Sequence, residues 1–155
     1  QWIYFGRPIG DFGTAYTYRA MVALVGLGAN TVDVAIYPKT HTDAAGAALT
    51  GEKTYTIHFE TLPPTLEGGF WSVTAYNEEN FLIDNPIDRY CVNDRSAYRL
   101  NEDGTLDITL SEEAPEDPSN WLPVSDGEFH LFMRIYLPDM AALDTWQAPV
   151  IRVQE

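Results

Sequence analysis

Hydrophobic and polar residues alternate along several short stretches of the chain, as they do in half-buried β-strands. Residues 32–36 and 55–59 place a large apolar side chain at every second position. Further strands are predicted at 70–76, 81–83, 96–100, 105–110, 128–137 and 149–153. Asp103-Gly104 is typical of a hairpin turn between two of them. Because turn residues recur every eight to twelve positions, the pattern predicts a mainly β protein, an antiparallel β-sandwich or jelly roll.

The N-terminal part follows a different pattern. Residues 14–27 are rich in Ala, Met and Leu, which favour a helix, with Thr14 as its cap and Gly28 as its stop. Apolar residues occur on nearly every face of this predicted helix, so we expect it to be largely buried. The first dozen residues include Trp2 and Phe12, and we expect them to pack on this domain or on a partner. One short helical turn is predicted at 138–143.

Length and charge narrow the possible partners. A chain of 155 residues with 45% hydrophobic content is sufficient for one domain over 1–155. Nine basic and 23 acidic residues give a net charge of −14, which argues against nucleic acid and anionic membrane surfaces as partners. The longest apolar run, residues 20–29, is shorter than the about 20 residues that span a bilayer, so we expect a soluble segment. Cys91 is the single cysteine, which excludes an internal disulfide.

The order of several motifs identifies a family. These are Leu27-Gly28-Ala29-Asn30, Phe70-Trp71-Ser72, Asn85-Pro86, Arg89-Tyr90, Asn120-Trp121-Leu122-Pro123 and Arg134 with Tyr136 and Pro138. With them, essentially the whole chain resembles the domain-of-unknown-function 1214 family. The resemblance implies a jelly-roll β-sandwich that often forms the C-terminal half of a larger, frequently exported bacterial protein, so we expect a second domain upstream and a periplasmic or otherwise exported location. The family implies no catalytic residues. Val124-Ser125 departs from its usual small residue and proline after Trp-Leu-Pro.

Two pairs of residues could contribute to a metal site. His58 with Glu60, and His130 with Glu128, lie at alternate positions, so each pair shares one face of its predicted strand. If those strands were neighbours, two imidazoles and a carboxylate would suit zinc or iron. Neither pair has a recognised ligand spacing, and we predict no metal and no cofactor.

Nucleophilic catalysis has even weaker support. Ser72 lies inside a predicted strand without the Gly-x-Ser-x-Gly elbow. Cys91 stands beside Tyr90 and Val92, which is typical of a small buried apolar residue. No glycine-rich loop opens a helix. The sequence therefore favours a protein that is not an enzyme.

A set of polar and aromatic residues remains as a candidate ligand site: Tyr76, Arg89, Glu128, His130, Arg134 and Tyr136. Rings, amides and guanidinium groups of this kind build ligand clefts, although each could instead fill the core or satisfy a turn. Arg134 and Tyr136 are the strongest candidates, because they lie on the polar side of a strand whose other side is apolar. Trp71, by contrast, is expected to anchor the core.

Three functions follow from these observations. The first is a non-catalytic β-sandwich domain that binds a small molecule, an upstream domain or an identical subunit. The second is an enzyme with a polar pocket on the sandwich face, using His130, Arg134, Tyr136 and Glu128. The third is an interface module, for which a large exposed apolar face would be the sign.

Overall fold

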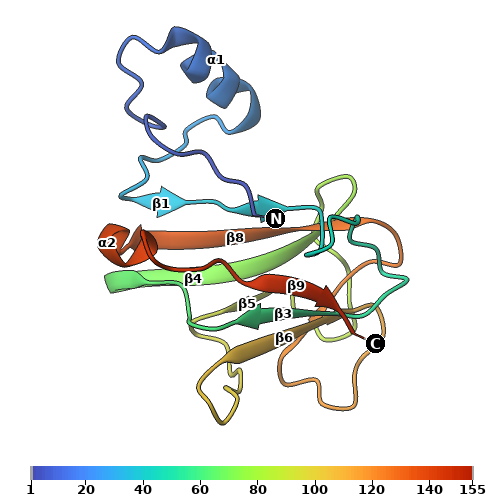
Figure 1. Ribbon diagram of the computed structural model, residues 1–155. Helices are drawn as coiled ribbons and strands as arrows, with labels where there is room; N and C mark the ends of the chain where they lie inside the picture. The colour runs from blue at the N-terminus through green and yellow to red at the C-terminus, as the bar shows by residue number, and fades with distance from the viewer. Residues whose placement is uncertain (1, 155) are drawn as a thin grey trace.

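Two β-sheets pack face to face in the computed structural model, which describes residues 2–154 (Figure 1). The five-stranded sheet consists of β1 (Ala35–Ile36), β2 (Lys39–Thr40), β8 (Phe129–Pro138), β4 (Thr65–Asn77) and β5 (Cys91–Asn93). The four-stranded sheet has the order β7 (Trp121–Pro123), β6 (Leu106–Ser111), β3 (Tyr55–Phe59) and β9 (Val150–Val153). The helices are α1 (Tyr16–Val25) and α2 (Met140–Leu143).

The core lies between the two sheets and follows from the alternation of the strands. Tyr55, Ile57 and Phe59 of β3 are buried, while the residues between them are half-buried. The ring of Phe59 lies 5.6 Å from that of Trp71 on β4, across the interface between the sheets. Trp71 is 3% exposed, which confirms the prediction that it anchors the core.

The predicted sandwich is confirmed in its main features, with three differences in the strands. β6 and β7 pair in parallel, so the four-stranded sheet is mixed and not purely antiparallel. Residues 96–100 form no strand, and 81–83 contribute a single isolated bridge at Leu82. Three short strands, β2, β5 and β7, were not predicted, because two or three residues are too few to show a period.

The prediction of a buried N-terminal helix is wrong. Only Val22 of α1 is buried, and Leu24 is 85% exposed. The helix belongs to a lobe, residues 2–34, that stands off the edge of the five-stranded sheet beyond β1 (Figure 1). One face of the helix is therefore enough to fill the small interior of the lobe, which includes Ile9 and Val32. No side chain caps its start, so the predicted Thr14 cap is also wrong.

The C-terminal helix agrees with its prediction. Asp139 precedes α2 and accepts hydrogen bonds from the backbone of Ala141 and Ala142 through its carboxylate. Within residues 2–154, neither helix is long and apolar enough to cross a membrane.

Candidate functional site

The outer face of the five-stranded sheet holds four of the six predicted site residues. Along β8 from Phe129 to Tyr136, odd-numbered residues enter the core and even-numbered residues lie on the other side, which places His130, Arg134 and Tyr136 on the outer face. Tyr76 on β4 lies directly opposite His130. Lys39 on β2 lies directly opposite Phe132. We call this surface the basic aromatic face; it consists of Lys39, His41, Tyr76, His130, Phe132 and Arg134.

Two cations each lie close to the same aromatic ring at the centre of this face. The Lys39 ammonium lies 5.0 Å from the centroid of the Phe132 ring, and the Arg134 guanidinium lies 5.4 Å from the same centroid. Arg134 also lies 5.7 Å from the centre of the Tyr76 ring. All three distances are within the range of cation–π attraction. Burial lowers the pKa of Lys39, because the charged ammonium loses part of its hydration.

Arg134 is held by neutral groups. Its Nη1 donates to Thr74 Oγ1 at 3.2 Å and its Nη2 donates to the Tyr76 hydroxyl at 2.9 Å. Within residues 2–154, the ion pairs involve Arg99 and His58, and no carboxylate lies within 4 Å of Arg134 or Lys39. The guanidinium is therefore oriented by the sheet without being neutralised by it.

A stack of three rings closes one end of the face. The His130 ring lies 4.8 Å from that of His41 on one side and 5.7 Å from that of Tyr76 on the other. His130 is 2% exposed, and among the described residues its Nε2 has no hydrogen-bond partner. Burial first, and then the charges of Lys39 and His41, lower the pKa of His130 to about 4, so the ring is neutral at pH 7.

Tyr136 extends the face through aromatic packing. Its ring stacks on that of Phe70 at 4.5 Å, and its hydroxyl accepts a 3.5 Å hydrogen bond from Tyr37. This bond and partial burial raise the pKa of Tyr136. The predicted residue is thus on the expected side of β8, at the opposite end of the row from His130.

The other two predicted residues do not join the cluster. Glu128 is exposed at the start of β8, where its charge acts on His41; burial and Lys39 nevertheless keep the pKa of that imidazole below its usual value. The Nη1 of Arg89 donates to the backbone carbonyls of Pro118, Ser119 and Trp121 at 2.8, 3.2 and 2.8 Å. Arg89 therefore holds the loop before β7 in place.

The two His/Glu pairs considered as metal ligands belong to different sheets, so they cannot converge. His58 lies on β3 of the four-stranded sheet, where Nδ1 is 2.7 Å from Asp107 and Nε2 is 3.3 Å from Glu60. The hydrogen bond to Asp107 is the main reason that its pKa is raised. No group of three or more potential ligands within residues 2–154 is arranged to hold a metal ion.

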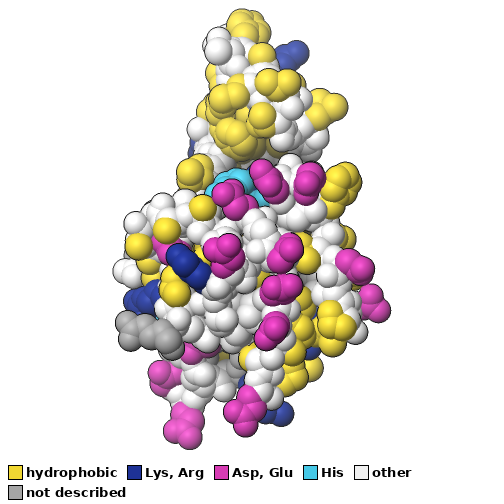
Figure 2. Space-filling view, turned by 90° about the vertical axis from the view of Figure 1, so that its right-hand side faces the viewer, with side chains coloured by type: hydrophobic (Ala, Val, Ile, Leu, Met, Phe, Trp, Pro, Cys, Tyr) yellow, Lys and Arg dark blue, Asp and Glu magenta, His cyan; other side chains and the backbone are white. Residues whose placement is uncertain are grey.

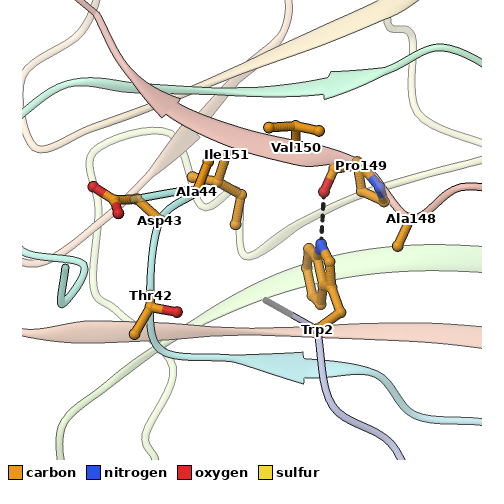
Figure 3. Close-up of a pocket in the computed structure, with 8 residues that line it drawn as sticks. All are labelled: Trp2, Thr42, Asp43, Ala44, Ala148, Pro149, Val150 and Ile151. Atoms are coloured by element: carbon orange, nitrogen blue, oxygen red, sulfur yellow. Dashed lines mark hydrogen bonds between the residues drawn. The ribbon is translucent and has the colours of Figure 1, made fainter. Parts of the chain in front are cut away.

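Two hollows lie away from the basic aromatic face. The smaller has a volume of about 130 Å³ and is walled by Trp2, whose indole donates to the Pro149 carbonyl at 2.8 Å (Figure 3). It is below the roughly 300 Å³ of common ligand pockets. The larger, about 560 Å³, is open and carries Asp84, Glu112 and Asp126 on its walls.

Sequence reasoning missed three members of the face: Lys39, His41 and Phe132. A weak signal existed, because Tyr37, Lys39 and His41 stand at alternate positions and so share one side of an extended segment. Residues 39–51 are small, polar and rich in Gly and Ala, which predicts a loop and obscured this signal, since β2 contains just two residues of that range.

Solved structures share this fold. The crystal structure of the VPA0106 protein from Vibrio parahaemolyticus matches with a TM-score of 0.76 and 30% identity, over 88% of this chain and 35% of that chain. A putative uncharacterized protein from Burkholderia cenocepacia matches with a TM-score of 0.54 and 21% identity, over 77% of this chain and 29% of that one. The chain thus spans about a third of the length of these two proteins. None of the curated proteins matches it.

The family model described as "Protein of unknown function (DUF1214)" matches residues 34–140, which include strands β1 to β8 and end at the start of α2, before β9. The match covers more than half of the chain and begins where the N-terminal lobe ends. The chain belongs to the DUF1214 family.

Proposed function

We propose that this protein is a non-catalytic β-sandwich domain that binds a small carboxylate with a flat apolar body on its basic aromatic face. One observation carries the proposal: Lys39 and Arg134 approach the same Phe132 ring, and no carboxylate within residues 2–154 pairs with either of them. A bound anion would be attracted by both charges.

The charge of the whole chain supports this interpretation. In a protein with a net charge of −14, a cation would be expected to find one of the 23 acidic residues. Arg134 is instead fixed by the Thr74 and Tyr76 hydroxyls, with hydrogen-bonding capacity left on the guanidinium. A guanidinium presents a fork that matches a carboxylate, which selects this class of anion.

The rings on the face define the rest of the ligand. Phe132, Tyr76 and Tyr136 are each half-buried, so part of each ring remains accessible. A planar apolar body can stack on such a surface while its carboxylate reaches the cations. The large acidic hollow is unsuited to the same ligand, because Asp84, Glu112 and Asp126 would repel it.

The test is a calorimetric titration with benzoate, the simplest planar carboxylate, and with benzamide, its neutral analogue. We expect benzoate to bind, benzamide to bind at least tenfold more weakly, and Arg134→Met to weaken benzoate binding by about tenfold or more, since charged hydrogen bonds contribute about 1.5–3 kcal/mol. Arg152→Met is the matched control, because it removes the same charge from the exposed side of β9. Equal benzoate affinities in Arg134→Met and wild type, or no benzoate binding to wild type, would reject the proposal.

An enzyme on the same face remains the alternative prediction, and conversion of an added carboxylate during the titration would favour it. The jelly-roll connectivity and the export that the family resemblance implies also remain predictions.

A further inference from the structure

The N-terminal lobe, residues 2–34, exposes an unusual amount of apolar surface. Six of its large apolar residues are more than half exposed: Ile3, Tyr4, Tyr16, Leu24, Val25 and Leu27. Leu24 and Leu27 are 85% and 87% exposed. Together the six residues expose on the order of 900 Å², which is close to the roughly 800 Å² that one partner contributes to a standard interface.

The lobe also differs from the sandwich in charge. Residues 1–34 contain two basic and two acidic residues, so their net charge is zero. Residues 35–155 contain seven basic and 21 acidic residues, which carry the whole net charge of −14. Figure 2 shows apolar side chains gathered over the lobe and acidic side chains spread over the sandwich below it. An uncharged apolar surface loses little hydration energy on burial, whereas the acidic sandwich stays in solvent.

The lobe is built to present this surface. Its interior takes up Ile9, Val22 and Val32, so α1 has a fixed inner face. Its base is attached to the sheet through the backbone pairing of Ile3 with Lys39. The exposed residues of α1 and the loop after it therefore form the outer side of an ordered unit.

We propose that the lobe docks into an apolar groove of another folded domain of the same polypeptide. The chain spans 35% and 29% of the two solved relatives, so most of each of those proteins lies outside the matched domain. The family match begins at residue 34, so the lobe precedes the part of the chain that the family model matches. A second copy of this chain is a poorer occupant, because it would bring together two sandwiches that each carry −14. The proposal involves Lys39 only through its backbone pairing with Ile3, so it stands independently of the ligand of the basic aromatic face.

Hydrogen–deuterium exchange tests this proposal on two proteins: the complete polypeptide encoded by the natural gene, and residues 1–155 alone. In the complete polypeptide we expect the amides of α1 to exchange at least tenfold more slowly, because docking protects the helix from opening. Leu24→Glu should abolish this difference, since it places a charge in the interface. Leu100→Glu is the matched control, because Leu100 is 49% exposed on the sandwich.

Three results would overturn the proposal. One is the same exchange rate for α1 in both wild-type proteins. The second is a complete polypeptide with no further folded domain. The third is a dimer of residues 1–155 that Leu24→Glu dissociates in sedimentation, which would assign the lobe to a second copy. The wild-type comparison is decisive by itself if a variant fails to fold.

Discussion

The substitution Arg89→Met tests whether Arg89 has a structural role or a ligand-binding role. Arg89 is a predicted site residue whose Nη1 instead donates to three carbonyls, two in the loop before β7 and one at the first residue of β7. Asn85 fixes its backbone from the other side, accepting from the Arg89 amide at 2.9 Å and donating to the Arg89 carbonyl at 3.1 Å. Arg89→Met keeps most of the side-chain volume and removes the donor, so the three carbonyls lose a shared partner.

The expected loss follows from this geometry. A hydrogen bond to a charged group contributes about 1.5–3 kcal/mol to stability. All three bonds come from one nitrogen of Arg89, and the carbonyl of Pro118 is partly solvated, so the loss is closer to one full bond than to three. We therefore expect the free energy of unfolding to fall by about 2 kcal/mol, which lowers the Tm of a domain of this size by roughly 4–8 °C.

Thermal unfolding followed by circular dichroism measures this change, with Arg152→Met as the control for loss of one positive charge. The Tm of the control is expected to stay within about 1 °C of wild type, because surface substitutions typically change stability by less than 0.5 kcal/mol. A Tm for Arg89→Met that equals the control value would refute the structural role of Arg89.

Two further predictions concern stability. A Cβ at Gly51 would lie 1.8 Å from the Ser125 carbonyl oxygen, so we expect Gly51→Ala to lower the free energy of unfolding, measured in urea, by about 3 kcal/mol or more. Gly127→Ala should lower it little, because nothing lies within 4 Å of a Cβ at Gly127. Equal urea midpoints for the two variants would contradict this prediction. The hydrogen bond to Asp107 raises the pKa of His58 in the folded state, so its stabilising contribution is complete below the unfolded pKa of about 6.5 and is lost as the pH rises through the folded pKa. The stability difference between wild type and His58→Gln should therefore shrink from pH 6 to pH 8.5, and a constant difference would count against the pairing.

The sandwich was predictable where the strands are long enough to show a period. In β3, and in β8 from Leu131 to Tyr136, side-chain burial alternates residue by residue, so the sequence records directly which face is inside. The short strands β5 and β7 depend on their neighbours, and a parallel pairing such as that of β6 with β7 has no local signal. The helix α1 was misjudged for a related reason. Apolar residues on all faces of a helix indicate that the helix is buried against another surface, and the sequence does not say which molecule or domain provides that surface.

The candidate site was predictable in part. The position of Arg134 on the outer side of β8 follows from the alternation of its strand. The approach of Lys39 depends on the pairing of β2 with β8, which joins residues more than ninety positions apart. His130 points outward yet is buried, because the rings of His41 and Tyr76 cover it. Such long-range pairings come from the fold and not from local pattern.

The central claim is that the basic aromatic face binds a carboxylate, and an NMR titration of the ¹⁵N-labelled chain with benzoate tests it most directly. The predicted result is a set of saturable shifts in the amides of residues 37–41, 74–76 and 130–136, which weaken as salt is added because the attraction is electrostatic. Shifts confined to other parts of the chain, or none at millimolar benzoate, would contradict the account.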